Sequence, residues 1–168
     1  FYIASDMCTD DMWMGNTTQD PGEYRDLAHY TGNTYNAGNA CQNFWQYRYK
    51  GILRSNVAIE QIPKVVFENE SLKKRYIAEA KFLRAFHYFE LVRNFGGVPL
   101  VLGLKLPSEI TGIKRATVED TYAQIEKDLL EAIPDLPKRS EYDAMDLGRA
   151  TKGAAQGYLA KAYLYQGK

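Results

Sequence analysis

The chain has 168 residues, of which 45% are hydrophobic and 25% are charged, which is enough for one globular domain with its own core. Lys plus Arg and Asp plus Glu both number 21. A formal net charge of zero excludes a global electrostatic attraction to nucleic acid or to an anionic membrane surface, so a neutral or locally recognised ligand is expected.

Residues 1–40 are predicted to form a loop-rich segment. They are rich in Asn, Thr, Gly, Asp and Tyr, and they show no lasting 3.6-residue pattern. Binding residues often lie on loops that a rigid scaffold positions. We therefore expect this segment to form part of a ligand-facing lobe.

Two helices are expected next. Apolar residues of 41–62 recur on one helical face, with Asn56 on the same stripe and Pro63 at the end. A buried Asn56 is costly without a partner, so we expect it to bond a loop carbonyl or a backbone amide of a neighbouring segment. Residues 70–95 carry two apolar stripes, which predicts a helix packed between neighbours.

A helix stop and a third helix follow. Gly96, Gly97 and Pro99 are expected to end the second helix, because glycine readily takes the left-handed conformation and proline cannot continue a helix. The third helix is predicted over 117–133. It opens with the pattern of a capping box, and its apolar residues recur at spacings of three and four.

The fourth helix is predicted over 150–166, where Gly and Ala residues would let a partner helix approach closely. An offset of 75 residues aligns it with the second helix and pairs Ala80 with Ala155, Ala85 with Ala160, and Tyr88 with Tyr163. Residues 41–168 are therefore expected to hold two related tetratricopeptide-like helix pairs.

Three motifs give the sequence a family resemblance. Residues 79–89 read EAKFLRAFHYF, residues 95–101 read FGGVPLV and residues 148–155 read GRATKGAA. In this order they resemble the hallmark stretches of the SusD/RagB family of outer-membrane nutrient-binding lipoproteins. The resemblance is strong over 41–168 and weak over 1–40.

The resemblance implies an all-α, SusD-like fold of antiparallel tetratricopeptide-like helix pairs, an alpha-alpha superhelix. Family members capture glycans or peptides on the surface of Gram-negative bacteria and deliver them to a TonB-dependent SusC-type transporter. A lipid anchors them in the outer membrane. Neither Cys8 nor Cys41 follows an apolar signal region, so we expect the lipid-bearing cysteine to lie upstream of this chain. The resemblance also implies that the C-terminal part of the family fold lies outside this chain.

Aromatic, amide and acidic side chains of the first segment are the candidate ligand contacts. A pyranose face stacks on an aromatic ring while polar groups bond its hydroxyls. The candidates are Trp13, Tyr30, Tyr35, Asn36, Asn39 and Asp11. In the alternative interpretation, the rings pack this segment against the helices and the polar residues form its turns. The sequence leaves both interpretations open.

Several charged residues are expected to serve structure. Arg84 lies in the middle of a helix, where it would pair with a carboxylate on a neighbour, and Arg149 is given a structural role as well. The acidic residues of 117–133 are expected to form a solvated helix face. His87 is expected to make a structural hydrogen bond rather than to act in catalysis.

No catalytic or cofactor motif is present. The chain contains no P-loop, dinucleotide fingerprint, nucleophile elbow, HExxH helix or cysteine pattern of a zinc site. We therefore expect no enzyme activity, no cofactor and no bound metal. The expected function is cell-surface binding of glycan or oligosaccharide nutrients for import. The alternative function is a tetratricopeptide-type scaffold that binds a peptide or a partner protein.

Overall fold

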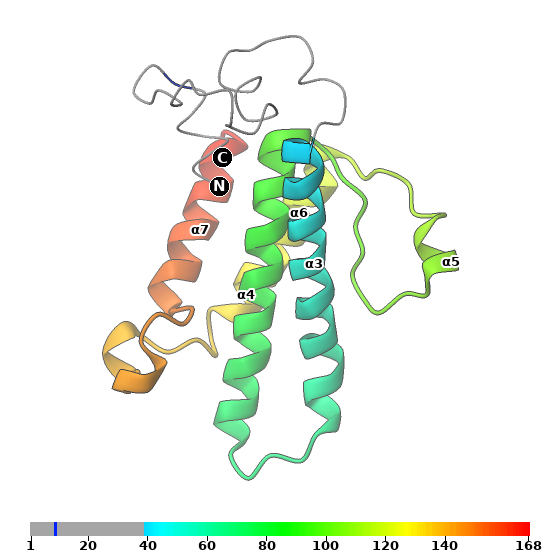
Figure 1. Ribbon diagram of the computed structural model, residues 1–168. Helices are drawn as coiled ribbons and strands as arrows, with labels where there is room; N and C mark the ends of the chain where they lie inside the picture. Colours follow the sequence, from blue (N-terminus) through cyan, green and yellow to red (C-terminus); the bar gives the residue numbers. More distant parts are fainter. Residues whose placement is uncertain (1–8, 10–38) are drawn as a thin grey trace, which may run out of the picture. The chain divides into compact units, whose positions relative to one another are not determined.

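The computed structural model describes Thr9 and residues 39–168, and every regular element in this part is helical (Figure 1). The chain divides into two compact units, Phe1–Tyr47 and Arg48–Lys168. The helix pairs belong to the second unit, except that α3 begins at Asn39, in the first. The main helices are α3 (Asn39–Gln61), α4 (Glu70–Phe95), α6 (Val118–Ala132) and α7 (Lys152–Tyr165). The short ones are η2 (Ile62–Lys64), α5 (Pro107–Ile110), η3 (Arg139–Glu141) and η4 (Ala144–Asp146).

The first pair consists of α3 and α4, which run antiparallel and side by side (Figure 1). A 3-10 turn that contains Pro63 follows α3. The side chain of Asn69 accepts hydrogen bonds from two amides of the first turn of α4 and so caps that helix. Gly96 ends α4 with a φ of 71°, in the region that favours glycine.

The second pair consists of α6 and α7. Thr117 and Thr151 cap the two helices, because each side chain accepts a hydrogen bond from the amide three residues later. Helix α6 packs against both α4 and α7. Its length differs by a residue or two from the predicted 117–133, and α7 likewise begins two residues after the predicted position 150.

The core lies around α4, which buries side chains on more than one face. Tyr88, Phe89 and Leu91 are fully buried in it, and Ile125 and Leu129 of α6 are buried beside them. Burial of each such side chain contributes about 1.5–3 kcal/mol. On another side of α4, Tyr158 of α7 makes edge-to-face contacts, 5.6–5.9 Å between ring centroids, with Phe82, Phe86 and Phe89.

The alanines that the 75-residue offset pairs were compared by their exposure, and only one of the two pairs is buried in both helices. Ala80 and Ala155, which the 75-residue offset pairs, are 5% and 0% exposed. Ala85 is also buried, whereas its counterpart Ala160 is exposed. The difference arises because α4 is packed on two sides, whereas within the described residues α7 packs mainly against α6.

Candidate functional site

Five of the six candidate ligand residues, Trp13, Tyr30, Tyr35, Asn36 and Asp11, lie outside the described residues. The sixth, Asn39, is the first residue of α3. Helix α3 therefore begins inside the segment that was expected to be loop-rich as far as residue 40. The functional features that the structure does describe lie on the helical frame and on the segments that connect its helices.

A buried ion pair joins α4 to α6. Arg84 Nε lies 2.8 Å from Asp128 Oδ2, and a terminal guanidinium nitrogen lies 2.6 Å from Oδ1. The residues are 7% and 0% exposed. Burial opposes the charge on Arg84, but the hydrogen bond and the charge of Asp128 outweigh it and raise the pKa of the guanidinium. The expectation that the acids of α6 form a solvated face is therefore wrong for Asp128.

Asn56 connects this ion pair to the segment after α4, residues 97–104, which we call the strap. Its side-chain oxygen accepts a hydrogen bond from Arg84, 2.9 Å. Its amide nitrogen donates to the carbonyls of Val101, 2.8 Å, and Gly103, 3.3 Å. Since Asn56 is fully buried, these bonds satisfy both polar ends of a side chain that has no access to water.

Two tyrosines and a glutamate hold the rest of the strap. Tyr49 donates to the carbonyl of Pro99, 2.7 Å, and Glu60 accepts from the amide of Leu104, 2.7 Å. The hydroxyl of Tyr88 accepts from the amide of Val101 at 2.8 Å and lies 3.1 Å from its carbonyl. Tyr49 and Glu60 were missed in the sequence. The signal was their spacing of seven and four residues from Asn56, which places all three on one face of α3.

Most of the strap belongs to a longer connecting segment, residues 98–116, which we call the excursion. Hydrogen bonds join the two ends of the excursion. The amide of Ala116 donates to the carbonyl of Val98, 3.2 Å. Arg115 donates to the carbonyls of Phe95 and Gly97. A Cβ on Gly97 would stand 2.1 Å from the carbonyl oxygen of Ala116, so only glycine fits this crossing.

The outer part of the excursion carries exposed aliphatic side chains. It includes α5 and projects away from the helix pairs (Figure 1). The exposed residues are Leu102 (43%), Leu104 (38%), Leu106 (66%) and Ile110 (45%). Neighbouring aliphatic residues that face water on a segment with a fixed base are typical of a contact surface.

A second network fastens the connector between α6 and α7 to α4. Arg149 donates to Glu79, 2.8 Å, and to Asp146, 2.7 Å. Arg75 also donates to Asp146, 2.9 Å. Tyr142 lies buried against Glu79, and burial, followed by the charge of Glu79, raises the pKa of its hydroxyl to about 12. Through these contacts, Arg149 helps to hold the connector between α6 and α7 against α4.

His87 packs against the backbone of α3 at Gly51. A Cβ on Gly51 would stand 2.0 Å from His87 Nε2, so the imidazole occupies the space that a larger residue would need. Burial, followed by the charge of Arg48, lowers the pKa of His87 to about 4. Nδ1 is buried without a hydrogen-bond partner among the described residues, so the expected structural hydrogen bond is not found at this atom.

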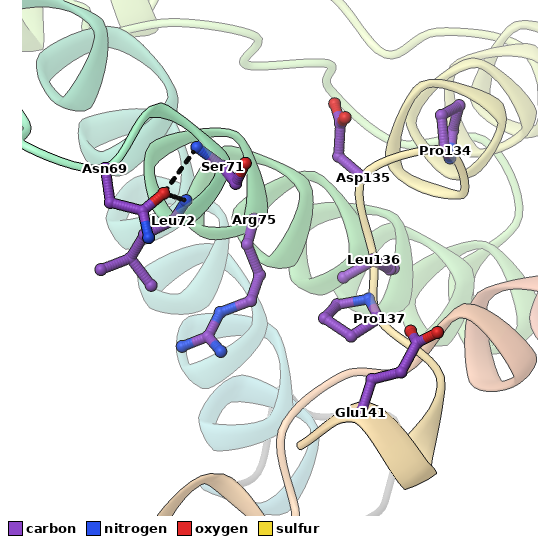
Figure 2. Close-up of a pocket in the computed structure, with 9 residues that line it drawn as sticks. All are labelled: Asn69, Ser71, Leu72, Arg75, Pro134, Asp135, Leu136, Pro137 and Glu141. Carbon is purple, nitrogen blue, oxygen red and sulfur yellow. Dashed lines mark hydrogen bonds between the residues drawn. The ribbon is translucent and has the colours of Figure 1, made fainter. Parts of the chain in front are cut away.

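A hollow of about 430 Å³ lies between the start of α4 and the segment that follows α6 (Figure 2). One wall is formed by the first turns of α4 and the other by residues 134–141. The lining residues are Asn69, Ser71, Leu72, Arg75, Pro134, Asp135, Leu136, Pro137 and Glu141. The hollow thus combines apolar side chains with neutral and charged polar groups.

The described residues contain neither a metal-binding cluster nor a membrane-spanning helix. Among residues 39–168, no three His, Cys, Asp or Glu side chains are grouped so that they could hold a metal ion. In the same part of the chain, no helix has the length and apolarity needed to cross a bilayer.

A SusD-like family model, described as starch-binding and associating with the outer membrane, matches residues 4–164. The chain belongs to the SusD-like family. The SusD-like protein P2 of Formosa agariphila is 33% identical over 125 residues, which cover 74% of this chain and 24% of that protein. A second protein of that organism, SusD-like protein P38, is 36% identical over 93 residues, which cover 55% of this chain and 18% of that protein.

Solved SusD-like structures share the fold. A laminarin-binding SusD-like protein superposes with a TM-score of 0.80 at 36% identity, covering 91% of this chain and 32% of that one. Surface glycan-binding protein A of Bacteroides uniformis gives a TM-score of 0.82 at 28% identity, covering 98% of this chain and 36% of that one. The chain thus spans about a third of these structures or less. The all-α fold of tetratricopeptide-like pairs implied by the resemblance is confirmed.

Proposed function

We propose that this chain is part of a cell-surface protein that binds glycan nutrients and delivers them to a TonB-dependent SusC-type transporter. The observation that carries the proposal is the structural likeness to a laminarin-binding protein and to a surface glycan-binding protein, over 91% and 98% of the chain. The capture is passive: the ligand is held by ring stacking and by hydrogen bonds to its hydroxyls, and no bond in it is broken.

The described geometry supports a frame that holds binding segments in place. The strap is fixed by hydrogen bonds that Tyr49 and Asn56 donate to its carbonyls and that Glu60 and Tyr88 accept from its amides. Asn56 in turn accepts a hydrogen bond from Arg84 of the buried ion pair. A contact surface that is already ordered loses less conformational entropy when its partner binds. Most of the strap is the start of the excursion, so the order of the strap favours the transporter contact proposed below.

We assign the glycan contacts to the first segment of the chain, as the residue types there suggest. Aromatic rings and amides are the groups that bind sugars, by stacking and by hydrogen bonding respectively. The proposed contacts are Trp13, Tyr30, Tyr35, Asn36, Asn39 and Asp11.

The proposed partner and location follow from the family. The description of the family model as associating with the outer membrane supports a place at the cell surface, held by a lipid anchor. We place the transporter contact on the exposed aliphatic residues of the excursion, Leu102, Leu104, Leu106 and Ile110. Burial of these side chains by a partner protein would remove apolar surface from water.

Native gel electrophoresis in gels that contain soluble polysaccharide tests the glycan part. Laminarin, starch and an unrelated plant polysaccharide are each compared with a gel without polysaccharide. We expect one of them to slow the chain, and we expect Trp13→Ala and Tyr35→Ala to reduce the retardation. Unchanged retardation in both variants would show that the rings of Trp13 and Tyr35 do not bind the glycan. Calorimetric binding of short peptides, with no glycan retardation, would favour the peptide-binding scaffold instead.

A further inference from the structure

The hollow beside the start of α4 is separate from the strap. The strap follows the C-terminal end of α4, whereas Asn69, Ser71 and Leu72 lie at its N-terminal end. From there the strap runs back along α3 as far as Glu60. None of the residues that line the hollow belongs to 97–116, so the hollow is not part of the excursion's contact surface.

The walls of the hollow are already formed. Leu136 is 3% exposed, and its amide donates to the carbonyl of Ala132, 3.2 Å. The carbonyl of Pro137 accepts from the amide of Lys152, 2.8 Å. Glu141 accepts from the amide of Lys138, 2.7 Å. Small-molecule sites have volumes of about 300–1,000 Å³, and the volume of this hollow, which is open to solvent, falls in that range.

The charges of the hollow argue against an anion. Asp135 and Glu141 place two carboxylates on one wall (Figure 2). On the other wall, Asn69 Oδ1 already accepts from the amides of Ser71 and Leu72, 2.9 and 3.1 Å, so these amides are not available to a ligand. Arg75 is engaged by Asp146. Arg75, the one cationic side chain among the lining residues, is thus paired with carboxylates of the protein, Asp146 and Glu79.

The remaining groups suit a neutral ligand that carries many hydroxyls. The amide nitrogen of Asn69 and the hydroxyl of Ser71 have no hydrogen-bond partner within residues 39–168. Leu72 and the two prolines supply apolar surface for the C–H face of a sugar ring. Asp135 supplies an acceptor for its hydroxyls.

We propose that this hollow is a second glycan-contact site, which takes one end of a neutral oligosaccharide on the helical frame itself. The proposal rests on the glycan-binding function argued above. A second contact on the same polymer would raise the overall affinity through effective concentration, without any change at the first site.

The test is a titration of the isotopically labelled chain with laminarihexaose and with maltohexaose, followed by amide NMR. We expect saturable shifts at the amides of Asn69, Ser71, Leu72, Asp135 and Leu136. Ser71→Tyr fills the hollow and should weaken the binding read at these amides about tenfold or more. Ser108→Tyr is the matched control, because Ser108 is likewise an exposed serine at the second residue of a helix, α5; its binding should be unchanged.

Two outcomes would overturn the proposal on its own. One is a set of saturable shifts confined to residues 1–38 or 98–116, and the other is an equal response of the Ser71→Tyr and Ser108→Tyr variants. In both cases, glycan binding itself would stand. An absence of saturable shifts anywhere with either oligosaccharide would overturn both the hollow and the glycan-binding function on which it rests.

Discussion

Arg84 of α4 and Asp128 of α6 form a two-pronged ion pair in the interior, with donor–acceptor distances of 2.8 and 2.6 Å. The same guanidinium also donates to Asn56 of α3. One side chain therefore connects three helices, and through Asn56 it reaches the strap. At this pair the first helix pair is joined to the second by charge as well as by packing, and Lys81 and Glu131 form a second charged link at the surface.

Asp128→Ala should destabilise the chain strongly. The variant leaves the Arg84 charge buried without its partner, and the loss of one member of a buried pair costs about 3–5 kcal/mol. Urea denaturation measures the free energy of unfolding. The double variant Arg84→Met, Asp128→Leu removes both charges and should recover most of the loss. A double variant as unstable as the sum of the two single changes would contradict the account.

Asn56→Ala should loosen the strap. It removes the donor to Val101 and Gly103 and the acceptor for Arg84, so about 1–3 kcal/mol is expected from polar groups left unpaired. Hydrogen exchange should speed up at the amides of 98–104. Asn94→Ala is the control, because the exposed Asn94 makes its only described side-chain bond to a carbonyl in its own helix. Equal exchange in both variants would refute a role for Asn56 in holding the strap.

Gly51→Ala should destabilise the chain although alanine favours helices. The new Cβ would overlap the imidazole of His87, and overpacking of this kind costs about 1–3 kcal/mol. Gly157→Ala, in α7, meets nothing within 4 Å and should stabilise by about 0.5–1 kcal/mol. Thermal melts compare the two. If the steric explanation holds, the added change His87→Ala makes Gly51→Ala harmless; an unchanged penalty would exclude it.

His87 should make stability depend on pH between about 6.5 and 4. Its pKa falls from 6.5 to about 4 on folding, so in this window the unfolded chain binds more protons than the folded one. Stability is therefore full above pH 6.5 and is lost as the pH falls, by at most about 1.4 kcal/mol per pH unit. The check is the urea midpoint at pH 7 and pH 5 for the natural chain and for His87→Leu. The slope should be smaller in the variant.

Above pH 5, the acids with lowered pKa values contribute little to this change. The pKa values of Glu126, Glu131 and Asp146 lie below their ordinary values, because side-chain hydrogen bonds stabilise the charged forms. The donors are Lys168 and Gln166 for Glu126, Lys81 for Glu131, and Arg75 and Arg149 for Asp146. As the pH falls, these acids lose their contribution to the free energy of unfolding at a lower pH than His87 does. Identical slopes for the natural chain and His87→Leu would show that another group, such as His29, causes the dependence.

The helices could be predicted because their signals are local. Residues 70–95 were predicted from two apolar stripes and a glycine stop, and α4 occupies Glu70–Phe95. Thr117 was identified from the capping pattern, and its side chain accepts from the amide of Asp120. These features depend on neighbours three or four residues away, so one sequence is enough to find them.

Partners across the fold could not be named in the same way. Arg84 was expected to pair with a carboxylate on a neighbour, but α6 offers several, and only the helix packing selects Asp128. Likewise, Asn56 was expected to bond a loop, but the carbonyls of Val101 and Gly103 were not identifiable. The hollow has no sequence signal, because its two walls are at least 59 residues apart in the sequence.

Whether the chain binds glycans without cleaving them is tested by measuring binding and then analysing the oligosaccharide for cleavage. Laminarihexaose and maltohexaose are titrated into the chain in a calorimeter, and the oligosaccharide is then recovered and analysed by chromatography. We expect saturable heat with at least one of the two and full recovery of the intact hexasaccharide. Shortened products would contradict passive capture, and a lack of saturable heat with both would contradict glycan binding by this chain.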